Sequence, residues 1–180
     1  MERPSIELRD PRALRALAHP TRLALVGLLR REGPMTATQA GARLDELPAA
    51  CSFHLRQLAK WGLVEEAGGG RGRERPWRAT AWSTSWTVTS DEDADANAAL
   101  SSVVVERLTR DLLGWLERMP DASQPWRASY QLGDTLLTLT PAETAELGER
   151  IRALLAEYDG REPSPEAEPV VALYAAYPAR

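Results

Sequence analysis

The sequence predicts a mainly helical α+β protein with a basic N-terminal part and an acidic C-terminal part. Three observations lead to this prediction. Short segments with helical apolar spacing, bounded by capping residues, prolines or glycines, fill the N-terminal third. Two β-prone segments around a glycine- and arginine-rich turn follow them. A long segment with a continuous apolar stripe then leads into a mixed C-terminal region.

The first two helices are predicted from their end signals. Asp10 is a cap with proline next to it at the first helical position, and Pro20 breaks the helix that follows. A second helix covers residues 20–31 and buries apolar side chains. It ends at Gly33, which is followed by another proline.

A helix-turn-helix pattern comes next. Thr36 and Gln39 have the spacing of a capping box, which predicts a third helix over residues 37–44. Residues 45–47 are the turn. Pro48 begins the fourth helix at a position where its missing N–H group costs nothing.

The fourth helix has two different faces. Cys51, Leu55 and Leu58 stand at i, i+4 and i+7 and form an apolar stripe. The opposite face carries short, hydrogen-bonding and cationic side chains, which suit the major groove because Arg can pair with guanine and Gln with adenine. We therefore predict that this face contacts DNA. The candidate contacts are Ala49, Ser52, Phe53, His54, Arg56, Gln57 and Lys60.

The basic stretch after this helix predicts a β-hairpin wing. Residues 63–66 form a short strand, residues 68–76 a flexible turn and residues 77–82 the returning strand. Arginines in the turn are natural partners of backbone phosphates, since a mobile loop supplies charge without strict geometry. A solvated charge run is the alternative. The phosphate candidates are Arg71, Arg73 and Arg75.

Three motifs together resemble the winged-helix domain of ArsR-type transcriptional regulators. They are Leu17-Ala18-His19-Pro20-Thr21-Arg22, Ser52-x-His54-Leu55-x-x-Leu58 and Gly62-Leu63-Val64. The resemblance covers residues ~10 to 82 and is specific as an ordered set. It implies a homodimeric transcription factor, usually a repressor released by a ligand or metal. By matching position, it gives Ser52, His54, Arg56 and the wing arginines DNA-contact roles. His54 lies beside the apolar stripe, so a structural or phosphate-binding role is equally open.

The distribution of charge agrees with a DNA-binding N-terminal part. Residues 1–80 carry 14 Lys or Arg against 9 Asp or Glu, whereas residues 81–180 carry 8 against 17. The pI of 5.3 for the whole chain hides this difference. A basic DNA-binding region on an acidic body accounts for it.

Neither metal sensing nor catalysis is predicted. The single Cys51 faces the core and the two histidines are too few, whereas soft-metal sites need several thiolates or imidazoles. The acidic residues 91–95 lack the glycine and final glutamate of a calcium loop and are better explained as the start of a helix. No nucleophile with a base, carboxylate pair or cofactor loop is recognisable, so we expect no cofactor and no enzyme.

Three regions are expected: a DNA-binding domain over residues 1–82, a connector over 83–95, and a dimerisation and possible effector-binding region over 96–180. A helix over residues 96–119 carries more apolar surface than a free helix can expose. We expect it to pair with its copy in a homodimer, because symmetric dimers set the spacing of DNA half-sites. The predicted interface residues are Leu100, Val104, Leu108, Leu112 and Trp115.

The remaining chain predicts a small α+β layer. Strands are expected over residues 126–132, 135–140 and 170–177, with a helix over 141–158 that Thr140 caps. Large aromatic side chains are candidate walls of a pocket for an apolar small-molecule effector, and core or dimer packing is the alternative. They are Trp82, Trp86, Trp115, Trp126 and Tyr130.

We therefore expect a sequence-specific regulator that binds double-stranded DNA as a dimer, and the family resemblance favours a repressor. The alternative is a winged-helix protein-interaction module that does not read DNA. The sequence shows no leader and no apolar run near the length of a membrane span, so neither secretion nor membrane insertion is indicated and a cytoplasmic location is expected.

Overall fold

The computed structural model describes residues 5–69, 75–86, 91–158, 161–162 and 164–179, with residues 91–93 described by their backbone alone. The chain divides into two compact units, one ending at Thr109 and the other beginning at Arg110. We call them the N-terminal unit and the C-terminal unit. Helix α5, Asp91–Arg118, contributes to both.

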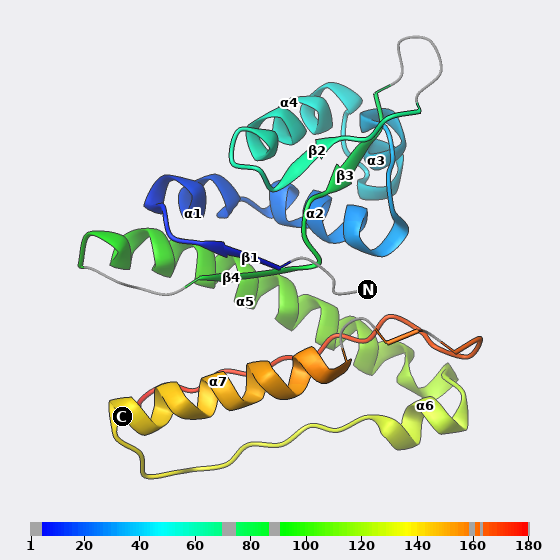
Figure 1. Cartoon of the computed structure of the whole chain (residues 1–180). Coiled ribbons are helices and arrows are strands. Elements are labelled where there is room, and N and C mark those ends of the chain that lie inside the picture. Colours follow the sequence, from blue (N-terminus) through cyan, green and yellow to red (C-terminus); the bar gives the residue numbers. More distant parts are fainter. Residues whose placement is uncertain (1–4, 70–74, 87–90, 159–160, 163, 180) are drawn as a thin grey trace. The chain divides into compact units, whose positions relative to one another are not determined.

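Four helices build most of the N-terminal unit, at the positions that the sequence predicts (Figure 1). They are α1 (Pro11–Leu17), α2 (Pro20–Glu32), α3 (Ala37–Leu44) and α4 (Pro48–Ala59). The predicted caps are present. The Asp10 carboxylate accepts the Arg12 N–H at 2.8 Å, and Thr36 and Gln39 form a reciprocal capping box with bonds of 2.8 and 3.2 Å.

The turn between α3 and α4 depends on two local features. Asp45 has a left-handed conformation with φ of 54° and ends α3. Gly41 is buried, and a Cβ there would stand 2.6 Å from the backbone oxygen of Glu46. Because Gly41 has no side chain, the turn packs directly on α3 and sets the position at which α4 begins.

Two small sheets complete this unit. Strand β2 (Val64–Glu66) pairs antiparallel with β3 (Trp77–Ala79), as the predicted wing requires. The returning strand is shorter than predicted and ends at Ala79 rather than residue 82. A second pair, β1 (Ser5–Leu8) with β4 (Ser83–Trp86), is parallel and was not predicted.

The core of the N-terminal unit is continuous and includes part of α5. Leu14, Leu25, Leu55 and Leu58 are almost completely buried together. Leu100 of α5 joins them with no exposed surface, and Val104 packs partly against the same cluster. The predicted dimer role of Leu100 is therefore wrong, because this side chain already has an intramolecular cover.

The C-terminal unit contains the end of α5 and a few further helices. They are the 3-10 turn η1 (Met119–Asp121), α6 (Gln124–Ser129) and α7 (Pro141–Tyr158). Helix α7 begins as predicted, because Thr140 and Glu143 exchange hydrogen bonds at 2.7 and 3.3 Å.

The three strands predicted for this unit are wrong. Residues 124–129 are helical, since a proline lies in the first turn after Ser123. Residues 130–140 and the described part of 164–179 have no regular strand. A strand needs a partner for its backbone hydrogen bonds, and neither segment has one in the described chain. The sheets therefore belong to the N-terminal unit alone among described residues, within a fold that is mainly helical as predicted.

Candidate nucleic-acid interface

Helix α4 presents the two faces that its sequence predicts. Cys51, Leu55 and Leu58 have no exposed surface and anchor the helix to the core. The other face is open, and even the large Phe53 side chain is 52% exposed there. The core contacts thus fix which side chains can meet a ligand outside the domain.

The candidate contacts on α4 differ in exposure. Ala49, Phe53, Arg56 and Lys60 are exposed, and Ser52, His54 and Gln57 are half-buried. The Arg56 Nε group donates to the Ser52 carbonyl oxygen at 3.2 Å, and Lys60 Nζ donates to Gln57 Oε1 at 3.4 Å. Both cations therefore lie along the helix and have donors left for an outside acceptor.

Cross-strand ion pairs organise the wing. Arg75 Nη1 lies 2.9 Å from Glu66, and Arg78 Nη2 lies 2.6 Å from Glu65. All four side chains are largely exposed, so each pair contributes little to stability. The pairs do hold carboxylates beside the arginines, which reduces the net positive charge of this part of the wing. Arg71 and Arg73 lie outside the described residues.

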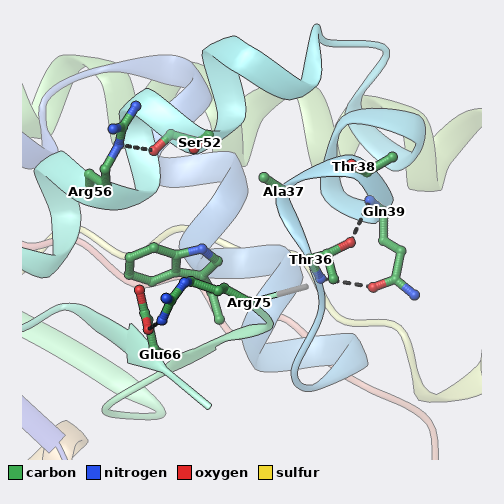
Figure 2. Close-up of a pocket in the computed structure, with 9 residues that line it drawn as sticks. Thr36, Ala37, Thr38, Gln39, Ser52, Arg56, Glu66 and Arg75 are labelled. Carbon is green, nitrogen blue, oxygen red and sulfur yellow. Dashed lines mark hydrogen bonds and ion pairs between the residues drawn. The ribbon is translucent and has the colours of Figure 1, made fainter. Parts of the chain in front are cut away.

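A pocket of about 730 Å³ separates α4 from the wing. Figure 2 shows its lining from three elements: Ser52 and Arg56 on α4, Glu66 and Arg75 on the wing, and residues 36–39 at the start of α3. Trp77, 8% exposed, completes the lining. The pocket brings the predicted Ser52, Arg56 and Arg75 together.

Residues at the start of α3 were missed as part of this site. Thr38 and Gln39 are exposed at the pocket, next to backbone N–H groups of the first helical turn. Such groups carry partial positive charge and favour anions. The capping box predicted the helix start, and that start was the signal from which an anion contact could have been inferred.

His54 has a more structural setting than the other candidates. Its ring lies 4.5 Å from that of His19, centroid to centroid, and 5.3 Å from that of Phe53. His19 caps α2, because its Nδ1 accepts the Thr21 N–H at 3.2 Å. The His54 Nδ1 is buried without a hydrogen-bond partner in the described chain.

The two imidazoles favour the neutral state. Burial lowers the pKa of His19, and the charge of Arg22 lowers it further. Burial also lowers the pKa of His54, with His19 and Arg22 acting in the same direction. Glu46 opposes these effects. The pair therefore adds little positive charge to the surface at neutral pH.

The predicted aromatic pocket residues divide between the two units. Trp82 and Trp86 flank or belong to β4 of the N-terminal unit, and Trp86 packs partly against its core. In the C-terminal unit the Trp115 and Tyr130 ring centroids lie 6.1 Å apart. Trp115 Nε1 and Tyr130 Oη are buried without a hydrogen-bond partner in the described residues. Trp126 is half-buried in the same unit.

Helix α5 also exposes apolar side chains. Val105 is 58% exposed and Leu113 is 55% exposed, whereas the predicted interface residues Leu108, Leu112 and Trp115 are half-buried. Within the described chain, no helix is long and apolar enough to cross a membrane. No group of three or more His, Cys, Asp or Glu side chains placed to hold a metal ion occurs among the residues that the structure describes.

Residues 17–67 match the family model of a helix-turn-helix domain, and no curated protein matches the sequence. Three similar solved structures are ZitR from Lactococcus lactis, a MarR family regulator from Neisseria meningitidis and YusO from Bacillus subtilis. ZitR is 16% identical, with 79% of this chain and 84% of that chain covered and a TM-score of 0.35. The Neisseria regulator is 16% identical, with 77% and 80% covered and a TM-score of 0.33. YusO is 15% identical, with 82% and 83% covered and a TM-score of 0.35.

The matching family model describes helix-turn-helix domains and does not single out the ArsR type. Its limits include α2, α3 and α4, so it covers the helices that present the candidate interface. The match to a helix-turn-helix domain supports a role for this chain as a DNA-binding transcriptional regulator.

Proposed function

We propose that this protein is a sequence-specific, dimeric transcriptional repressor related to the ArsR-type regulators. The observation that carries the proposal is the outward face of α4. Its Arg56 and Gln57 have the donors and acceptors that distinguish bases in the major groove, and they lie opposite the buried Leu55–Leu58 stripe. In this role Arg56 reads a guanine and the neighbouring polar side chains set the register.

We propose that the pocket beside α4 binds a phosphate group of the DNA backbone. Arg75 supplies a cation from the wing, and Thr38 and Gln39 stand beside the N–H groups of the α3 start. Contacts of this type fix the position of a protein on DNA and leave sequence selection to base contacts. Lys60 and the wing residues Arg71 and Arg73 are proposed to bind further phosphates.

The test of the proposal is binding to a duplex selected by the full-length protein from a random pool. We expect affinity that falls with salt, because phosphate contacts release condensed counterions. Removing the charges of Arg71, Arg73 and Arg75 together should reduce the slope of log K against log salt by about 0.9 for every phosphate that the wing no longer neutralises. A slope that stays unchanged in this triple variant would remove the wing from the interface.

A homodimer is proposed because a palindromic operator presents half-sites about 34 Å apart, which two linked recognition helices can engage. The exposed Val105 and Leu113 on α5 support this helix as the interface. Leu113→Glu should shift the protein to a monomer in light scattering, since a charge would enter an apolar contact. The exposed Arg110→Gln on the same helix is the control. A Leu113→Glu variant that remains a dimer would move the interface away from this face.

A winged-helix protein-interaction module is the second candidate. Leu47, which precedes α4, is 74% exposed and Phe53, in the middle of α4, is 52% exposed, and exposed apolar side chains of this kind also suit a protein partner. Selection of duplexes separates the two functions, because an interaction module enriches no sequence.

An apolar effector is proposed to act through the C-terminal unit, where the buried polar groups of Trp115 and Tyr130 offer hydrogen bonds to a bound molecule.

A further inference from the structure

Two arginine side chains, from α2 and α5, approach Gly27 in the N-terminal unit. Gly27 lies in the middle of α2, where glycine is a poor helix former. The Nη1 atoms of Arg31 and Arg107 lie 3.2 and 3.4 Å from the point that a Gly27 Cβ would occupy. Arg107 comes from α5, so the missing side chain leaves room for a guanidinium group that reaches across from another helix.

Arg30 adds a third charge to this cluster and is itself held by two hydrogen bonds. Its Nε donates to the Ala81 carbonyl oxygen at 2.8 Å, and its Nη2 donates to Thr84 Oγ1 at 2.6 Å. Burial lowers the pKa of Arg30 to about 10, and the nearby charge of Arg107 contributes to that shift. The two guanidinium groups therefore repel each other in a partly buried setting.

Neither Arg31 nor Arg107 has an acidic partner among the described residues. The Arg107 Nε is buried without a hydrogen-bond partner in the same part of the chain. Like charges held close together and a buried donor left unsatisfied both cost free energy. A bound oxyanion would remove both costs, because its oxygen atoms accept hydrogen bonds from more than one guanidinium group.

We propose that Arg31 and Arg107 form a binding site, with Arg30 behind them, for the carboxylate or phosphate group of a small molecule. The anion bridges α2 and α5. Helix α2 packs against the recognition helix α4. A ligand bound at this site therefore stabilises the helix on which the DNA-binding face rests. This site goes beyond the proposed function, and anion binding to it does not depend on DNA.

The site is tested by calorimetric titration of the full-length protein with sodium phosphate and, separately, with sodium acetate. Sodium chloride keeps the ionic strength constant, and the anion with the greater affinity identifies the preferred group. We expect Arg107→Gln to weaken binding of that anion by about tenfold or more, because it removes a charge-assisted hydrogen bond. The matched control is Arg110→Gln, which removes an exposed charge from the same helix and should leave binding unchanged.

A second variant distinguishes weaker anion binding from a failure of Arg107→Gln to fold. Gly27→Ala places a methyl group against both Nη1 atoms. Alanine favours the helix, so this variant should fold normally but bind the anion less tightly. Equal anion binding by wild type, Arg107→Gln and Gly27→Ala would overturn the proposal. The proposal would also be overturned if the wild-type protein bound neither anion and Arg107→Gln weakened the dimer. In that case the arginines would pair with acidic residues of a second copy of the chain.

Discussion

The close approach of the turn to α3 predicts the effect of replacing Gly41 with alanine. A Cβ at this position would lie 2.6 Å from the Glu46 carbonyl oxygen and 3.4 Å from the Pro48 nitrogen. Both neighbours are backbone atoms, so they cannot move aside as a flexible side chain can. Overpacking of this kind costs about 1 to 3 kcal/mol, and the better helix propensity of alanine returns about 0.5 to 1 kcal/mol.

We therefore expect Gly41→Ala to lower the free energy of unfolding of the N-terminal unit by about 1 to 2 kcal/mol. Urea denaturation followed by circular dichroism measures this, with the slope m unchanged and the midpoint lowered by about 0.5 to 1 M. DNA affinity should fall as well, because the shifted turn moves the start of α4.

Gly27→Ala is the matched control for Gly41→Ala. It is the same substitution inside a helix of the same unit, but its nearest atoms are the ends of two arginine side chains. It should leave stability unchanged or raise it by up to about 1 kcal/mol. The packing argument fails if Gly41→Ala is as stable as wild type, or if both variants are destabilised by the same amount.

Three other predictions concern the pocket, the histidines and the α3 cap. Glu66→Gln removes a carboxylate from the proposed phosphate site and should raise DNA affinity about two- to fivefold in anisotropy titrations; an unchanged affinity would place the phosphate elsewhere. The lowered pKa values of His19 and His54 mean that the unfolded chain binds more protons, so stability should be constant above about pH 7 and fall as the pH drops below about 6.5. His19→Asn keeps a capping side chain and should flatten this pH dependence, whereas an undiminished one would exclude His19 as its source. Thr36→Ala should lower the free energy of unfolding by about 1 kcal/mol, whereas Thr38→Ala, at an exposed position, should have little effect on it. Similar losses of stability in both variants would show that the Thr36 cap is not their cause.

The N-terminal helices could be predicted because their end signals are local. A proline after a cap, or a threonine three residues before a glutamine, determines hydrogen bonds within one helical turn. The outward face of α4 followed from the same kind of information, since its buried stripe repeats at helical spacing. The pocket required more, because its residues come from α3, α4 and the wing.

The errors at β1 and β4, at Leu100 and at residues 135–140 concern segments whose partners lie far away in the sequence or do not occur in the described chain. Strands β1 and β4 pair across more than 70 residues, and no local pattern identifies that register. Leu100 belongs to an apolar stripe whether that stripe packs in a dimer interface or in the core of one chain. The sequence therefore could not distinguish a dimer interface from the core that buries Leu100. The threonine- and leucine-rich composition of residues 135–140 resembles that of a strand, but a strand forms only where its backbone groups find partners.

The central claim, that the outward face of α4 reads DNA sequence, is tested most directly by Arg56→Ala. The variant and the wild type are titrated against the selected duplex and a scrambled duplex at one salt concentration. Removing a bidentate hydrogen bond to a base should cost about 1 to 3 kcal/mol on the selected duplex and relax the preference at one base pair in each half-site, with a smaller effect on the scrambled duplex. Equal reductions in affinity for the two duplexes would make Arg56 a phosphate contact and would contradict the claim.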